Sequence, residues 1–212
     1  MKIVVTGSAG FIGNHLCARL TADRHDVIGL DRKNGQDILT CDLPDADRVF
    51  HLAAQTDATS TDAGADAKDN IIGLLRVLQR YGPRAIFASS SMVNYPVTPY
   101  AISKLAGEHY ARFYGASVVR FCNVFGAGGH SLIDRFSEAE HLTIYGDGQQ
   151  NRTFAHVDSA VDLLIEAMAG PARTLVLRGS NHTVIEVADW NPHKPRVFLP
   201  AKPLDVLDGV QR

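Results

Sequence analysis

The chain has 212 residues, of which 45% are hydrophobic and 21% charged, a composition typical of a folded globular protein. Lysine and arginine total 21 against 23 aspartates and glutamates, so no basic surplus points to nucleic acid or to a membrane surface. The apolar runs are too short to span a bilayer, and three widely spaced cysteines suit a reducing cytoplasm and form no metal site.

Apolar, β-rich runs are predicted to alternate with helices along the first part of the chain. Strands are expected at 2–6, 26–31, 37–41, 48–53, 84–90 and 116–121, with helices at 10–22, 69–81 and 99–114. This alternation predicts an α/β fold with a Rossmann-type, doubly wound parallel sheet whose strands are buried on both sides.

The remaining segments show weaker patterns. Residues 56–68 contain no large apolar side chain, and we interpret them as a mobile loop or as a plain solvated one. Beyond residue 126 we expect helices over 131–139, 158–168 and 184–190. The predicted organisation is a cofactor-binding domain over 1–125 and a small, reduced substrate-binding subdomain over 126–212.

A glycine-rich turn joins the first strand to the first helix. Gly7, Gly10 and Gly13 allow a tight turn, close approach of a pyrophosphate and close helix packing, while the helix N-terminus offers free N–H groups. Asp31, at the end of the second strand, is placed to accept the adenosine ribose hydroxyls and to repel a 2′-phosphate. NAD is therefore favoured over NADP, although Arg32 beside it is able to pair with a 2′-phosphate.

A second constellation lies at the start of the helix over 99–114. Tyr100 and Lys104 stand at i and i+4, hence on one helix face. A neighbouring ammonium favours the phenolate, so we expect Tyr100 to act as a base near neutral pH. Ser91 follows the fifth strand, at the sheet edge where such folds bind ligands, and its hydroxyl is predicted to hold a substrate oxygen.

Several stretches between residues 4 and 158 together resemble the extended branch of the short-chain dehydrogenase/reductase family, the nucleotide-sugar epimerases and dehydratases. They are VVTGSAGFIG (4–13), HLAA (51–54), Asn70 with Gly73, SSSMVNY (89–95), PYAISK (99–104), RFCNVFG (120–126) and IYGDGQQNRTFAHVD (144–158), and KPLD (202–205) is a fainter match. Within this family the chain is most similar to the UDP-glucose 4-epimerases.

The resemblance implies a role for each matching residue. The catalytic set is Ser91, Tyr100 and Lys104. The cofactor is expected on Gly7, Gly10, Phe11, Ile12, Gly13, Asp31, Arg32, Asp42, Leu43, Leu52, Ala53, Ala54, Tyr100, Lys104, Phe121 and Val124, with Asp42 and Leu43 flanking the adenine. The substrate is expected on Ser91, Asn123, Arg152 and Lys202, where Arg152 would clamp the diphosphate.

The residues after Ser91 discriminate among reactions of the family. Dehydratases carry an Asp-Glu pair there and decarboxylases a Glu, whereas this chain has Met92 and Val93, which cannot exchange protons. The resemblance therefore favours a 4-epimerase of a nucleotide sugar, with a UDP-sugar preferred, that oxidises the sugar C4 transiently by bound NAD. A reductase of 4-keto nucleotide sugars and a non-catalytic NAD(P)-binding regulator are the alternatives.

The chain departs from the family by being short. Only LPDAD (43–47) stands where relatives have a helix, and eight residues separate Ser91 from Tyr100, where epimerases have a longer segment. The chain also ends soon after KPLD, so we expect a reduced substrate apparatus. Relatives pair the helices equivalent to 69–81 and 99–114, and a homodimer through them is expected.

Overall fold

The computed structural model describes residues 1–201, which form two compact units. The first unit contains Met1–Phe121 and Asp158–Leu177, and the second contains Cys122–Val157 and the described part of Arg178–Arg212. The chain thus returns to the first unit after residue 157. The functional division at residue 125 into a cofactor domain and a substrate subdomain stays a prediction.

The first unit is built on a sheet of six parallel strands in the order β2-β1-β3-β4-β5-β9. Their bounds are β1 Lys2–Thr6, β2 Asp26–Leu30, β3 Arg48–His51, β4 Ala85–Ser90, β5 Ser117–Phe121 and β9 Thr174–Val176. The strand order reverses between β1 and β3, the point at which sheets of this kind bind ligands beyond the carboxyl ends of their strands. The predicted Rossmann-type fold is confirmed.

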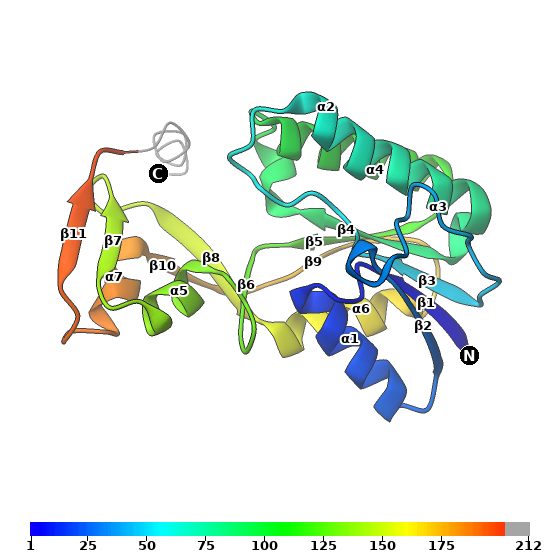
Figure 1. The fold of residues 1–212 in the computed structure, drawn as a ribbon, viewed down its shortest axis with the longest axis horizontal. Helices are drawn as coiled ribbons and strands as arrows, with labels where there is room; N and C mark the ends of the chain where they lie inside the picture. Colours follow the sequence, from blue (N-terminus) through cyan, green and yellow to red (C-terminus); the bar gives the residue numbers. More distant parts are fainter. Residues whose placement is uncertain (202–212) are drawn as a thin grey trace. The chain divides into compact units, whose positions relative to one another are not determined.

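Helices cover both faces of this sheet (Figure 1). The helices α1 (Phe11–Ala22) and α6 (Val157–Met168) lie on one face, where Arg19 and Asp162 pair at 2.8 Å. The helices α3 (Gly73–Tyr81) and α4 (Pro99–Phe113) lie on the other. Apolar side chains of β1, β3, β4 and β5 are fully buried because both faces are covered, which explains their continuous apolar runs.

The strand predicted over 37–41 is wrong. The Asp37 carboxylate accepts the Leu39 N–H at 2.9 Å, and the Asp37 carbonyl accepts the N–H groups of Thr40 and Cys41, so the segment turns back on itself. Ile38 is buried in the core beside α3, and no strand pairs beyond β2 in the first unit.

The loop predicted over 56–68 is helical in its last part. Asp62 caps helix α2 (Ala63–Asp66) by accepting the Ala65 N–H at 2.9 Å, and a π-helical stretch (Ala67–Ile72) leads directly into α3. The helix predicted from residue 69 therefore begins at residue 63. The alanine- and aspartate-rich composition concealed this cap.

The second unit has its own small core of Phe136, Leu142, Ile144, Phe154, Val184, Val187 and Ala188. Its elements are β6 Asn123–Phe125, α5 Leu132–Glu138, β7 Leu142–Tyr145, β8 Asn151–His156, β10 Ser180–Thr183, α7 Val184–Asp189 and β11 Arg196–Leu199. The strands form a sheet β10-β8-β6 and a pair β11-β7. The two helices were predicted, whereas these short strands were not.

Among the helices of residues 1–201, none combines the length and the apolar character that a membrane span requires.

Candidate functional site

The glycine turn after β1 is packed so closely that side chains are excluded. Gly7 has a φ of +70°, and a Cβ on it would lie 2.7 Å from the Ala53 nitrogen. A Cβ on Gly13 would lie 2.1 Å from the Gly7 carbonyl oxygen. Both glycines are required by the approach of α1 and of the chain after β3, and the turn lies where the sheet order reverses.

The N-terminus of α1 is available to an anion. Gly10 caps the helix without a side-chain hydrogen bond, and the first turn contains no acidic residue. The first N–H groups of a helix have no partner within it and carry partial positive charge. This end of α1 is therefore suited to a diphosphate.

Asp31, which follows β2, is a buried carboxylate held by the backbone. Its two oxygens accept the Ala9 N–H at 3.0 Å and the Lys33 N–H at 2.9 Å, and each keeps a further lone pair for a ribose hydroxyl. Arg32 lies 3.1 Å from Asp69 and 3.8 Å from Asp37. Because acids already neutralise Arg32, it is poorly placed to attract a 2′-phosphate.

The end of β3 lies directly beside the glycine turn. Thr6 accepts the Ala53 N–H at 3.2 Å and contacts His51 Nδ1 at 2.8 Å, so these residues join the ends of β1 and β3. Burial, together with the charge of Lys104, lowers the pKa of His51 to about 3, so the imidazole is neutral. Leu52, Ala53 and Ala54 follow at the sheet edge.

Tyr100 and Lys104 lie on the first turns of α4, which Thr98 caps by accepting the Ala101 N–H. The Lys104 side chain reaches back to β4: its Nζ donates to the Ala88 carbonyl at 3.0 Å and lies 5.9 Å from the Tyr100 ring centre. Lys104 is only 4% exposed, and burial lowers its pKa to about 8. Lys104 is thus mostly protonated at neutral pH, but it binds its proton less tightly than an exposed lysine does.

Burial raises the pKa of Tyr100, and a side-chain hydrogen bond with Ser90 lowers it in part. Burial has the larger effect, so the pKa of Tyr100 lies above its ordinary value in the protein alone, and the role of Tyr100 as a base stays a prediction. Ser90, the last residue of β4, also accepts the Met92 N–H at 3.2 Å. Sequence reasoning chose Ser91, which begins the 3₁₀ turn Ser91–Asn94, and missed Ser90.

A buried polar cluster behind α4 was also missed. Asn70, in the π-helical stretch, exchanges two hydrogen bonds with the Gln55 backbone, at 2.8 and 3.1 Å. Its amide nitrogen also lies 2.9 Å from Ser103 Oγ and 3.2 Å from Asp66 Oδ1. Burial raises the pKa of Asp66, and the charge of Asp66 acts on both Tyr100 and Lys104. Asp66 lies within the segment predicted as a loop. The one sequence signal that Asp66 is ordered is Asp62, a residue type that caps helices, at the N-terminus of α2.

The other predicted site residues are distributed between the two units. Phe121 is buried at the end of β5 in the first unit. In the second unit, Asn123 and Val124 lie on β6, Arg152 lies on β8, and Asn123 donates to the Thr153 carbonyl at 3.1 Å. Lys202 lies outside the described residues. Over residues 1–201, no three His, Cys, Asp or Glu side chains are grouped to hold a metal ion.

Comparison with known proteins finds one family model, described as the NAD dependent epimerase/dehydratase family, which matches residues 3–178. The chain is 32% identical to the Bacillus subtilis (strain 168) protein named as an uncharacterized UDP-glucose epimerase, YtcB, covering 81% of this chain and 73% of that one. It is 31% identical to the UDP-glucose 4-epimerase of Mycolicibacterium smegmatis, covering 81% and 74%.

A solved structure shares the fold. The UDP-glucuronic acid 4-epimerase of Bacillus cereus, in complex with UDP-glucuronic acid and NAD, has a TM-score of 0.83 and 26% identity over 95% of this chain and 87% of that one. The alignment with the Bacillus subtilis protein extends over 232 positions, more than this chain contains, so the chain lacks internal residues that this relative has.

Proposed function

The chain belongs to the NAD-dependent epimerase/dehydratase family, within the extended short-chain dehydrogenases/reductases, and we propose that it is a nucleotide-sugar 4-epimerase with tightly bound NAD. The observation that carries this proposal is the meeting of the glycine turn, Asp31 and the Tyr100–Lys104 pair in one unit, at the carboxyl edge of a parallel sheet. A UDP-sugar is the favoured substrate, because the named relatives act on UDP-sugars.

The residues present fit NAD. The glycine turn leaves no room for a Cβ, the N-terminus of α1 is suited to the diphosphate, and Asp31 keeps acceptor capacity for ribose hydroxyls. Asp42 and Leu43 are assigned to the adenine, and Leu52, Ala53 and Ala54 to the phosphate and ribose. Asp31 disfavours a 2′-phosphate and Arg32 is engaged by acids, so NAD is preferred over NADP. When bound, NAD supplies reversible hydride acceptance at the sugar C4.

The chain's own groups manage the proton. Tyr100 takes the proton of the sugar C4 hydroxyl and later returns one, while Ser91 holds the sugar oxygen. Lys104 supplies positive charge one helical turn away, which stabilises a phenolate as long as Lys104 stays protonated. Ser90 adds a hydrogen bond that lowers the Tyr100 pKa against the effect of burial.

Met92 and Val93 support an epimerase over a dehydratase or a decarboxylase. Both lie in the 3₁₀ turn Ser91–Asn94, and Val93 is buried. Neither side chain can donate or accept a proton, so these positions lack the acid–base groups that those two kinds of enzyme carry there. A reductase of 4-keto nucleotide sugars would use the same Ser, Tyr and Lys, and it differs by consuming external NAD(P)H.

A cytoplasmic homodimer through the helices over 69–81 and 99–114 is part of the proposal. Four large apolar side chains are exposed on this part of the first unit: Ile72, Ile102, Tyr110 and Phe113, the last to 83%. Exposed apolar side chains of this size favour burial against a partner. The cytoplasm is proposed because the three cysteines are free.

Two measurements test the proposal. Mass spectrometry of small molecules released on denaturation is expected to detect NAD, and UDP-glucose or UDP-glucuronate is expected to convert to its C4 epimer without added NADH. Tyr100→Phe should lose nearly all turnover and keep the circular dichroism spectrum and bound NAD of the parent protein. Full turnover in that variant, or strict dependence on external NAD(P)H, would contradict the epimerase assignment.

A further inference from the structure

Residues 38–46, here called the adenine segment, carry Asp42 and Leu43, the pair assigned above to the adenine of NAD. The segment belongs to no strand or helix, so its backbone carbonyls have no partners in a sheet ladder. Residues 43–47 also replace a helix that relatives have at this place. The conformation of the adenine segment therefore has to be fixed by contacts from elsewhere in the first unit.

Side chains of α3 and of the turn that follows it supply these contacts. They donate hydrogen bonds to five carbonyls of the adenine segment. The pairs are Arg76 to Ile38 and to Cys41 (3.1 Å for Cys41), Arg80 to Leu43 (3.4 Å), Tyr81 to Pro44 (2.6 Å) and Arg84 to Ala46 (2.8 Å). Arg80 pairs in addition with the Asp45 carboxylate.

The spacing of the arginines explains why one helix can serve the whole segment. Arg76 and Arg80 are four residues apart on α3 and so lie on the same helix face. The planar guanidinium of Arg76 donates to two carbonyls three residues apart, which the single ammonium of a lysine cannot reproduce with the same geometry. At the start of α3, a Cβ on Gly73 would lie 3.3 Å from Ile38 Cγ2, so the helix and the segment are in close contact there.

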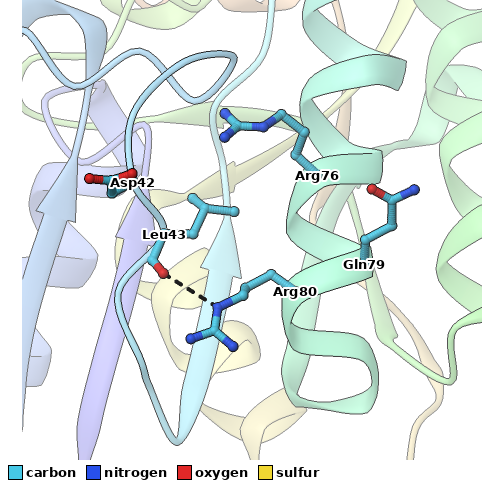
Figure 2. A pocket seen from close by; sticks show the side chains of 5 residues that line it. All are labelled: Asp42, Leu43, Arg76, Gln79 and Arg80. Atoms are coloured by element: carbon cyan, nitrogen blue, oxygen red, sulfur yellow. Dashed lines mark hydrogen bonds between the residues drawn. The ribbon is translucent and has the colours of Figure 1, made fainter.

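A hollow lies next to these hydrogen bonds, between α3 and the adenine segment. Figure 2 shows Arg76 and Arg80 on α3 directed toward Asp42 and Leu43, with Arg80 bonded to the Leu43 carbonyl, while the Gln79 side chain points away from the segment. The same five residues line a hollow with a volume of about 430 Å³. Leu43 also packs against the core, so the arginine hydrogen bonds add to apolar packing in fixing this part of the segment.

We propose that Arg76 and Arg80 are positioning residues for the adenine end of NAD: by holding the carbonyls of the adenine segment, they fix Asp42 and Leu43 where the adenine binds. This inference rests on the proposed function, since it takes NAD as the ligand. It assigns these arginines no contact with NAD itself. Their loss is expected to weaken recognition of the adenosine half and to leave the nicotinamide half unaffected.

The test compares three variants of the full chain, freed of bound nucleotide. Arg76→Met keeps the length of the side chain and removes its donors, and Arg76→Lys keeps the charge. Gln79→Ala is the matched control, because Gln79 lines the same hollow and makes no hydrogen bond to the segment within the described residues. Calorimetry measures the dissociation constant of ADP-ribose, and saturation-transfer NMR measures that of nicotinamide mononucleotide, which lacks adenosine.

The dissociation constant of ADP-ribose is expected to rise roughly tenfold in Arg76→Met and by less in Arg76→Lys, with Gln79→Ala unchanged. Binding of nicotinamide mononucleotide should stay the same in all three. Equal ADP-ribose affinity in parent and Arg76→Met overturns the inference. If Arg76→Met does not fold, parental ADP-ribose affinity in Arg76→Lys overturns it. A parent protein that binds neither ligand contradicts the proposed function instead.

Discussion

Glu108 is the most sharply testable group in the first unit, because it is a fully buried carboxylate that joins three elements. It lies on α4 one turn beyond Lys104 and accepts hydrogen bonds from Ser89 Oγ on β4 (2.8 Å) and from Arg120 on β5 (both 2.7 Å). Arg112, four residues later on α4, donates at 2.6 Å. We predict that Glu108→Gln destabilises the protein because Arg120 then lacks a counter-charge.

The magnitude follows from the exposure of the two arginines. The Arg120 side chain is 22% exposed, so loss of its buried partner should cost about 3 kcal/mol of the free energy of unfolding, the lower end for buried pairs. The Arg112 side chain is 46% exposed and screened by water, so the control Arg112→Gln should cost at most about 1 kcal/mol. Denaturant titration of the parent and both variants at pH 7 measures these values.

The pH dependence gives a second, independent check. Burial alone would raise the pKa of Glu108, but hydrogen bonds from Arg120 and Ser89 outweigh burial and lower it. A lowered pKa in the folded state adds stability above the unfolded pKa, about 4.3, and this stability is lost as the pH falls through the folded value. The difference between parent and Glu108→Gln should therefore shrink below about pH 4. A pH-independent difference, or a cost no larger than that of Arg112→Gln, would refute the reasoning.

Three further outcomes are expected. Lys104→Met should raise the free energy of unfolding at pH 7 by about 2 kcal/mol, because the pKa of Lys104 falls from 10.5 to about 8 on burial and only one hydrogen bond, to Ala88, is lost in exchange. The gain should shrink from pH 8 to 10.5, because the unfolded parent then binds more protons than the folded parent and the parent becomes more stable. Equal stability of parent and Lys104→Met in denaturant titration speaks against a buried charge. Ser90→Ala removes the hydrogen bond that lowers the Tyr100 pKa, so the acidic limb of the kcat/KM pH profile should move to higher pH. An unmoved limb contradicts this effect of Ser90 on Tyr100. Asp31→Asn should weaken NAD binding roughly tenfold in NADH fluorescence titrations and reduce the preference over NADP, whereas parental selectivity would remove Asp31 from the discrimination.

The sheet and the glycine turn were predictable because their signals are local. Continuous apolar runs mark strands covered on both faces, and Gly7 and Gly13 stand at close backbone approaches that leave no space for a Cβ. The i, i+4 spacing of Tyr100 and Lys104 likewise depends only on helix geometry.

Other elements depended on neighbours that are distant in the chain. Within the segment predicted as a strand over 37–41, the carbonyls of Ile38 and Cys41 find their partner in Arg76 of α3, more than thirty residues later. The helix over 63–66 was concealed by a composition that also suits a loop, and the charge of its Asp66 raises the pKa of both Tyr100 and Lys104.

The sequence by itself determined the Rossmann-type sheet, the glycine turn, the acid after β2 and the helical pairing of Tyr100 with Lys104, because sterics and periodicity act between residues close in the chain. Only the tertiary structure decided that Ser90 hydrogen-bonds Tyr100, that burial raises the Tyr100 pKa and lowers that of Lys104, and that arginines of α3 hold the adenine segment. Desolvation and hydrogen-bond partners are set by residues that folding brings together, so they do not appear in a local pattern.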